Sequence, residues 1–199
     1  MTIRPYVVEF IGTPEAGKTS TINQLSSMFK KEYISSLVVQ ESAELLPKHM
    51  PKKSNDADLW IRLHTLGKVI SAYYLENYDI ILIDRGCVDS RFWTTKYYED
   101  NLLSKEEYNT RLHLFDSKFL PDLVITLVVS PEVAISRKGS EGTIVNKAFI
   151  SDFNCQLLKF YDTIEISKIK FDTSSFTKEE TLSKVYKSIL YNYYMFCNQ

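Results

Sequence analysis

The sequence contains few of the features that mark secreted, zinc-binding or membrane-spanning proteins. Its 199 residues include three cysteines, Cys87, Cys155 and Cys197, which are widely spaced and form no CxxC pair. A disulfide framework or a zinc site is therefore not expected. No apolar run approaches the roughly 18 residues that a membrane-spanning helix needs, and the first residues lack the small-residue cleavage site of a secretory leader. We expect a cytoplasmic protein with no membrane partner.

An excess of charge of one sign is also missing. The 24 basic and 25 acidic residues leave a formal net charge of −1. This balance gives no bulk attraction to nucleic acid, so any charged ligand must meet a local site. The length and the 44% hydrophobic content are those of one globular domain that can bury a core. We expect residues 1–199 to form a single domain with no nucleic-acid partner.

Short apolar runs alternate with longer helical patterns, which predicts an α/β fold: a parallel sheet flanked by helices on both faces. Within one helical pattern, five apolar residues recur at helical spacing and are expected in the core: Leu59, Leu63, Leu66, Ile70 and Tyr74. Strands are expected at 6–12, 36–40, 79–84, 123–129 and 167–172, the last an edge strand because lysines interrupt it. Helices are expected at 18–32, 56–77, 89–98, 104–119, 146–163 and 177–196.

A phosphate-binding loop follows the first predicted strand. Gly12, Gly17, Lys18 and Thr19 match the pattern GxxxxGK[ST] between a strand and a helix, as this motif requires. The glycines let backbone N–H groups point inward, and the helix adds its N-terminal dipole. Lys18 can bring positive charge to the terminal phosphates, and the Thr19 hydroxyl can bind a bridging Mg²⁺. The predicted nucleotide-binding residues are Gly12, Thr13, Pro14, Glu15, Ala16, Gly17, Lys18, Thr19 and Ser20.

A carboxylate completes the predicted phosphate site. Asp84 ends the apolar strand at 79–84, and so lies at the carboxyl edge where ligands of open α/β sheets bind. From there it can hold Mg²⁺ opposite Thr19, directly or through water. The alternative is an aspartate that caps the next helix. We expect Thr19 and Asp84 as metal ligands in a three-layer P-loop NTPase fold with a five-stranded parallel sheet.

The P-loop does not by itself decide the function. Signalling GTPases carry DxxG and NKxD, but Asp84 is followed by RGC, and the only Asn-Lys pair reads NKAF, with Phe149 where the guanine-binding aspartate would be. A ring ATPase is disfavoured in a chain of this size with no arginine-rich subunit interface. A small-molecule kinase is the leading class.

Two further segments carry a resemblance to a known family. DRGCVDSRFW at 84–93 and PDLVITLVVSPEVAISR at 121–137 follow the P-loop in an order and spacing that resemble the deoxynucleoside kinase and thymidylate kinase branch of the P-loop kinases. The resemblance covers nearly the whole chain. It implies ATP- and Mg²⁺-dependent phosphoryl transfer to a nucleoside or nucleoside monophosphate, and a homodimer. The ESAE and DRG elements also resemble a group of ATP- or GTP-binding P-loop proteins.

The resemblance suggests roles for two residues near the acceptor. Glu41 follows the strand at 36–40, where deoxynucleoside kinases keep the carboxylate that accepts a proton from the sugar 5′-hydroxyl. A carboxylate beside a phosphate pocket could deprotonate an attacking hydroxyl. The alternative is a solvated loop glutamate, and Glu44 is a second candidate. Arg85 is expected to contact the acceptor or the moving phosphoryl group, or else to pair with a nearby carboxylate.

Further residues could contact the acceptor. Arg91 is a candidate on the helix after Asp84, although Asp89 and Arg91 could instead form a surface pair. Arg62 could also reach the acceptor, or be only solvated, since it lies off the apolar stripe of its helix. The lysine-bearing loop at 48–56 covers the acceptor in kinases of this type, or is an exposed linker.

The lid departs from the family pattern. Kinases of this branch place several arginines after the fourth strand, but the segment near 131–147 offers only Arg137, Lys138 and Lys147, and its two glycines predict a mobile loop. The pocket for adenine is expected between this segment and the loop before the last helix. The predicted catalytic residues are Lys18, Glu41, Arg85 and Arg137.

Two alternatives stay open at this stage. A lid with few cations favours a nucleotide-binding regulatory protein with little turnover. The same scaffold could also phosphorylate a non-nucleoside hydroxyl, such as that of a sugar, a vitamin or an antibiotic.

Overall fold

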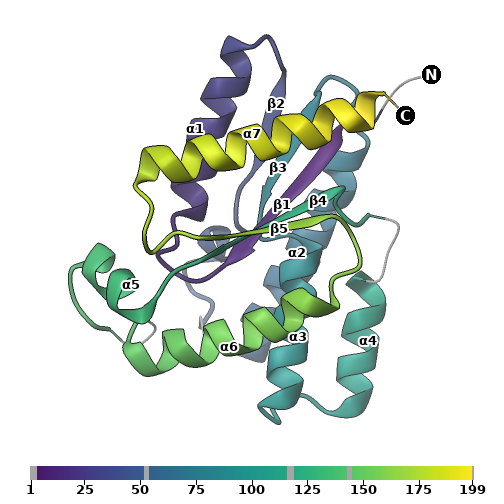
Figure 1. Cartoon of the computed structure of the whole chain (residues 1–199). Coiled ribbons are helices and arrows are strands. Elements are labelled where there is room, and N and C mark those ends of the chain that lie inside the picture. Colours follow the sequence, from purple (N-terminus) through teal and green to yellow (C-terminus); the bar gives the residue numbers. More distant parts are fainter. Residues whose placement is uncertain (1–3, 52–53, 116–118, 143–144, 199) are drawn as a thin grey trace.

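The computed structural model describes residues 4–51, 54–115, 119–142 and 145–198. Its elements alternate between strands and helices along most of the chain (Figure 1). In chain order they are β1 (Tyr6–Gly12), α1 (Lys18–Lys31), β2 (Ser36–Val39), the 3₁₀ helix η1 (Ser42–Leu45), α2 (Asn55–Tyr73), β3 (Ile80–Asp84), α3 (Cys87–Glu99), α4 (Lys105–Phe115), β4 (Leu123–Val128), α5 (Pro131–Lys138), α6 (Lys147–Thr163), β5 (Lys168–Asp172) and α7 (Lys178–Cys197).

The five strands form one parallel sheet in the order β2-β3-β1-β4-β5. The predicted sheet is therefore confirmed, with β5 at an edge as expected. The register sets Phe10 of β1 opposite Asp84 of β3, so the end of β3 lies beside the strand that leads into the P-loop. Two segments that are 65 or more residues apart in sequence thus meet at the carboxyl edge of the sheet, where ligands of such sheets bind.

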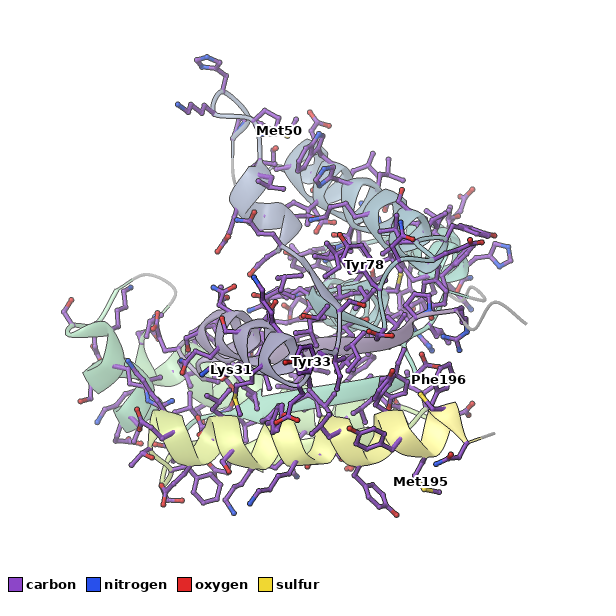
Figure 2. All side chains as sticks on the ribbon, turned by 90° about the horizontal axis from the view of Figure 1, so that it is seen from above. Lys31, Tyr33, Met50, Tyr78, Met195 and Phe196 are labelled. Atoms are coloured by element: carbon purple, nitrogen blue, oxygen red, sulfur yellow. The ribbon has the colours of Figure 1, made fainter. Side chains whose placement is uncertain are left out.

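Helices cover both faces of the sheet (Figure 1). Ile80 and Leu82 of β3 join a core cluster with α1 and α7, whereas Ile81 and Ile83 join a cluster with α2 on the other face. A third cluster packs Phe92 of α3 and residues of α6 against β1 and β4. Because β3 is buried on both faces, its sequence is a continuous apolar run rather than an alternation of apolar and polar residues. Figure 2 shows the layers from another side, with Met195 on α7 and Met50 at opposite sides of the molecule.

The lid segment begins as a helix, although a loop was expected. Ser130 accepts a hydrogen bond from the backbone of Val133, Pro131 opens α5, and Gly139 ends it in the left-handed region at φ 90°. These are the residue types that start and stop short helices, so α5 forms from local signals. Across the described ranges, the structure has no helix that is both long and apolar enough to cross a membrane.

The core face of α2 matches the prediction only in part, since Leu66 packs against the core cluster and three other residues of the stripe are exposed. Leu59, Leu63 and Tyr74 of the predicted stripe are 44%, 49% and 67% exposed. The buried side chains are instead those of Ala57, Arg62, Thr65, Val69 and Ala72. Polar residues can face inward here because each finds a partner: Thr65 donates to the Ser42 hydroxyl at 2.7 Å, and Arg62 pairs with Asp58 at 2.9 Å. Of the two alternatives for Arg62, the solvated side chain is therefore wrong.

Candidate active site

The P-loop joins β1 to α1 and depends on glycine at both ends. Gly12 has φ 143°, and a Cβ there would overlap with the Leu127 carbonyl oxygen of β4. Gly17 has φ 91° and stands at the N-cap of α1. Between them, Thr13 donates its backbone N–H to the Leu127 carbonyl at 3.0 Å, which anchors the loop to β4. The tight path follows from the freedom of glycine at positive φ.

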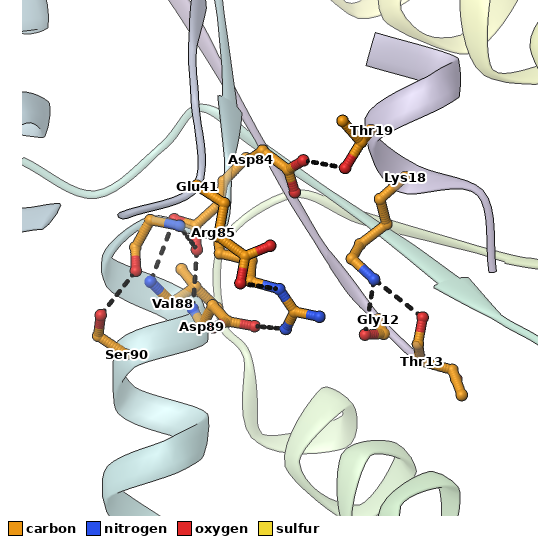
Figure 3. Close-up of polar contacts among 12 residues, drawn as sticks. Gly12, Thr13, Lys18, Thr19, Glu41, Asp84, Arg85, Val88, Asp89 and Ser90 are labelled. Atoms are coloured by element: carbon orange, nitrogen blue, oxygen red, sulfur yellow. Dashed lines mark hydrogen bonds and ion pairs between the residues drawn. The ribbon is translucent and has the colours of Figure 1, made fainter. Parts of the chain in front are cut away.

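Lys18 is the first residue of α1 and is buried. Its Nζ donates to the carbonyl oxygens of Gly12 at 3.1 Å and Thr13 at 2.8 Å, as Figure 3 shows. Burial, and then the charge of Arg85, lower the pKa of the Lys18 ammonium to about 7. A polyphosphate in the loop would oppose both effects, because a nearby anion favours the charged form. The lysine is thus placed to bind anions from inside the loop.

Thr19 and Asp84 lie together, as predicted. The Thr19 hydroxyl donates to Asp84 Oδ2 at 2.6 Å (Figure 3). The other oxygen, Oδ1, is buried and has no hydrogen-bond partner among the residues that the structure describes. A hydroxyl and a carboxylate are the oxygen ligands that suit Mg²⁺ together with phosphate oxygens, so these two residues fit the predicted ion. Asp84 does not cap the next helix, which was its alternative role. The N-cap residue of α3 is Gly86, and Asp84 bonds Thr19 instead.

Arg85 lies between two carboxylates. Its Nε is 3.1 Å from Glu41 Oε1, and its Nη1 donates to Asp89 Oδ1 at 2.9 Å (Figure 3). Burial raises the pKa of Glu41, and the neighbouring guanidinium opposes this. Burial would lower the pKa of Arg85, but Asp89 and Glu41 outweigh it and raise that pKa. Asp89 is buried, so its expected alternative as a surface partner of Arg91 is wrong.

A cavity of about 710 Å³ opens beside the P-loop. Its lining includes Pro14 of the loop together with Glu41 and Arg85, and apolar walls from α2, α3 and α6. The size is that of a small-molecule site. Glu44 is exposed, is bonded by Gln40 at 2.7 Å and is not part of this lining, so Glu41 is the better placed of the two predicted carboxylates.

A second polar cluster lines the same cavity, and sequence reasoning missed two of its members. Asp58 of α2 accepts from Arg62 Nη2 at 2.9 Å and also from Arg111 of α4. The Arg62 Nε is buried with no hydrogen-bond partner among the described residues. No motif marks Asp58 or Arg111, because their meeting depends on the packing of α2 beside α4.

The lid residues lie outside the phosphate loop. Arg137 Nη1 donates to the Glu15 carbonyl at 3.1 Å and to the Thr173 hydroxyl at 2.9 Å, and Nη2 donates to the Thr173 carbonyl at 2.6 Å. It borders a groove of about 330 Å³ between the P-loop and α7. Lys147 pairs with Glu132 at 3.7 Å. The predicted loop at 48–56 is divided: Lys48 is exposed, Ser54 and Asn55 line the cavity, and residues 52–53 lie outside the described residues.

Comparison with known proteins gives structural matches only. No family model matches the chain, and no curated protein matches its sequence. The deoxyadenosine kinase from M. mycoides with bound dATP is 18% identical, with 92% of this chain and 98% of that chain covered and a TM-score of 0.68. The same kinase with the products dCMP and a flexible dCDP is 20% identical, with the same coverage and TM-score. Identity at this level establishes the fold: the chain adopts a P-loop deoxynucleoside kinase-like fold, with five parallel strands between layers of helices.

Proposed function

We propose that this chain is a kinase that uses ATP and Mg²⁺ to phosphorylate a sugar hydroxyl of a nucleoside. The observation that carries the proposal is the shared cavity, in which Pro14 of the P-loop lines the same space as the Glu41–Arg85 pair. A carboxylate thus lies beside the place where phosphates would bind. The similar fold of a deoxyadenosine kinase solved with dATP supports the same chemistry.

The donor would bind in the P-loop. Backbone N–H groups of residues 12–20 would hold its phosphates, with Lys18 on the terminal ones. Thr19 and Asp84 would hold Mg²⁺, which neutralises charge on the phosphate oxygens when it is bound. The groove bordered by Arg137, Thr177 and Lys178 is the proposed place of the donor base. Arg137 would then act by holding the P-loop against the loop before α7.

The acceptor would bind in the large cavity with a hydroxyl at Glu41. The carboxylate of Glu41 would take the hydroxyl proton as the oxygen attacks the terminal phosphorus. The bond from that phosphorus to the bridging oxygen breaks, and ADP leaves. Arg85 would orient Glu41 and stabilise negative charge on the transferred group. The far polar cluster around Asp58 and Arg62 would contact the rest of the acceptor.

Charge at the Glu41 end of the cavity favours a nucleoside over a nucleoside monophosphate as the acceptor, although Asp58 with Arg62 and Arg111 carries a formal charge of +1 at the far end. Glu41 and Asp89 share the single guanidinium of Arg85, so this cluster of two carboxylates and one cation has a formal charge of −1. A phosphate on the acceptor would bring a further charge of about −1.5 to −2 to this place. Like charges held together are unfavourable, whereas a neutral hydroxyl carries no such cost.

A second candidate is a nucleotide-binding regulatory protein with little turnover. It is favoured by the position of Arg137, whose guanidinium is bonded to Glu15 and Thr173 rather than directed at the phosphate site. The homodimer that the family resemblance implies stays a prediction, which sedimentation velocity tests.

Label transfer tests the proposed activity. Purified protein would be incubated with Mg²⁺, γ-labelled ATP and a panel of nucleosides, nucleoside monophosphates and small hydroxyl compounds, beside Lys18→Ala. We expect label on a nucleoside, lost in Lys18→Ala. Tight ATP binding without transfer to any acceptor would favour the second candidate.

A further inference from the structure

Glu9 is a charged residue in the middle of the central strand. All seven residues of β1 are buried, and Glu9 is 0% exposed. A carboxylate in such a place is unfavourable unless it is hydrogen-bonded. Its oxygens accept three backbone N–H groups, from Gly86 at 2.9 Å, Val88 at 3.1 Å and Asp89 at 2.7 Å. Burial raises the pKa of Glu9 to about 7, and these three donors oppose the rise.

The three donors belong to the start of α3. This helix begins at Cys87 with Gly86 as its N-cap, and the N-cap supplies no side-chain hydrogen bond. Helix N-termini normally need a local acceptor for their free N–H groups. Here Glu9, which is 77 residues earlier in the chain than Gly86, supplies it from β1. The negative charge also lies at the favourable end of the helix dipole.

The segment that Glu9 fixes carries two residues of the candidate site. Arg85 comes immediately before Gly86 and has φ 59°, a left-handed conformation that is uncommon outside glycine. Asp89, whose N–H binds Glu9, accepts the Arg85 guanidinium with its side chain. The Arg85 backbone N–H donates to the Phe10 carbonyl at 3.1 Å. The turn is therefore tied to β1 at both of its ends.

Only a residue without a side chain at position 86 leaves room for the Glu9 carboxylate. A Cβ at Gly86 would lie 2.6 Å from Glu9 Oε2 and 2.8 Å from its Cδ, so any larger residue would push the carboxylate away. Ser90, one turn later, donates two hydrogen bonds to the Gly86 carbonyl, from its backbone N–H at 3.1 Å and from its hydroxyl at 2.9 Å. Carboxylate and glycine thus define one backbone path through residues 85–90.

We infer that Glu9 is a positioning residue of the acceptor site, whose carboxylate fixes the start of α3 so that Arg85 reaches Glu41 and Asp89. Glu9 lies in the core and does not line the cavity, so it acts through the backbone and through Arg85. The kinetic consequence rests on the proposed kinase activity, whereas the placement of Arg85 does not. A cap that only stabilised α3 would affect folding and leave the acceptor site unchanged.

The kinetic test compares Glu9→Gln with Val185→Ala. The amide keeps the size of the side chain but has one acceptor oxygen for the three backbone donors, and its NH₂ group would face at least one of them. We expect kcat/KM for the acceptor nucleoside to fall about 10- to 100-fold, because small displacements in a site have effects of this size, with KM for ATP changed by less than about twofold. Val185→Ala lowers stability from α7, on the other face of the sheet, and should leave both constants unchanged. Equal behaviour of the two variants would overturn the inference.

A second readout needs no turnover. The Arg85 Nε–H signal in a ¹⁵N–¹H spectrum, assigned by its loss in Arg85→Lys, should shift in Glu9→Gln, while the Arg62 Nε–H signal stays in place. An unshifted Arg85 signal in the folded variant would overturn the inference whatever the kinetics. If the wild-type protein transfers no label but the signal shifts, the proposed function fails and the positioning role stands. Should Glu9→Gln not fold, Glu9→Asp retracts the carboxylate with its charge kept, and the same shift is expected.

Discussion

Arg85 Nε lies 3.1 Å from Glu41 Oε1, although the two residues follow different strands of the sheet. The contact is an ion pair rather than a well-aligned hydrogen bond, so Glu41 is attracted to Arg85 without being locked by it. The side chain of Glu41 is 24% exposed, on the cavity wall. A carboxylate in this position can be oriented by the guanidinium and still turn toward a hydroxyl.

Glu41→Gln should remove the base and leave donor binding intact. We expect kcat to fall about 10²- to 10⁴-fold, the usual contribution of a positioned base, with little change in KM for ATP. Glu44→Gln is the matched control, since Glu44 is exposed and lies off the cavity. Steady-state kinetics with both substrates varied would measure this. An unchanged rate in Glu41→Gln would remove Glu41 from the mechanism.

The pH dependence of the rate should report the protonation of Glu41. Burial raises the pKa of Glu41 above its ordinary value of 4.5, so the base becomes protonated at a higher pH than a free glutamate would. At saturating ATP, the rate should therefore fall as pH decreases through this raised pKa. We expect kcat/KM for the nucleoside to show this acid limb and Glu41→Gln to lack it. An acid limb that persists in Glu41→Gln would assign it to another group.

Asp58→Asn should weaken acceptor binding alone. Asp58 accepts from Arg62 with one oxygen and from Arg111 with the other, so the amide, which has a single acceptor oxygen, would release one of the two guanidinium groups. The released guanidinium would lose its proposed contact with the acceptor, and a hydrogen bond to a charged group contributes about 1.5–3 kcal/mol, which predicts a rise in acceptor KM of about 10- to 100-fold. Asp56→Asn, on an exposed position of the same helix, is the control. A rise in KM for ATP instead would place this cavity on the donor side.

Two glycine substitutions should have opposite effects on stability. At Gly12 the φ is 143° and a Cβ would overlap with the Leu127 carbonyl, so Gly12→Ala should lower the free energy of unfolding by at least about 3 kcal/mol. Gly67 lies in α2, and among the described residues no atom beyond its own helix turn would lie within 4 Å of a Cβ there, so Gly67→Ala should raise it by about 0.5–1 kcal/mol. Urea denaturation measures both. A stable Gly12→Ala variant would mean that β4 does not confine the loop.

The Mg²⁺ concentration that phosphoryl transfer requires should depend on Asp84. Its Oδ1 is buried without a hydrogen-bond partner in the described ranges, and Thr19 bonds the other oxygen. Asp84→Asn should raise the Mg²⁺ concentration that gives half-maximal transfer, and EDTA should abolish transfer in the wild-type protein. A magnesium titration of both proteins measures this. Equal half-maximal concentrations would exclude Asp84 from the ion.

The strands and the P-loop could be predicted because their signals are local. A buried parallel strand is a short apolar run, as in β3 and β4, and the GxxxxGK[ST] loop fixes its own shape through Gly12 and Gly17. The meeting of Thr19 with Asp84 also follows, since both lie where parallel strands end at one edge. These parts of the site need no knowledge of how the helices pack.

The helix packing around the cavity could not be predicted in the same way. Hydrophobic spacing selected Leu59 and Leu63 of α2, but the cavity and its polar partners turn Arg62 and Thr65 inward. Glu9 appears in sequence as one residue of an apolar strand, and only the fold shows that it meets the start of α3. Each case depends on partners that are distant in the chain, which periodicity does not contain.

The most direct test of this account is a competition between a nucleoside and its own 5′-monophosphate for label from γ-labelled ATP. Both acceptors would be present at equal concentration, and labelled monophosphate and labelled diphosphate would be separated and counted. We predict labelled monophosphate from the nucleoside, because Glu41, Arg85 and Asp89 suit a neutral hydroxyl. Labelled diphosphate as the main product would contradict the account, because a phosphate would then bind where this cluster disfavours it.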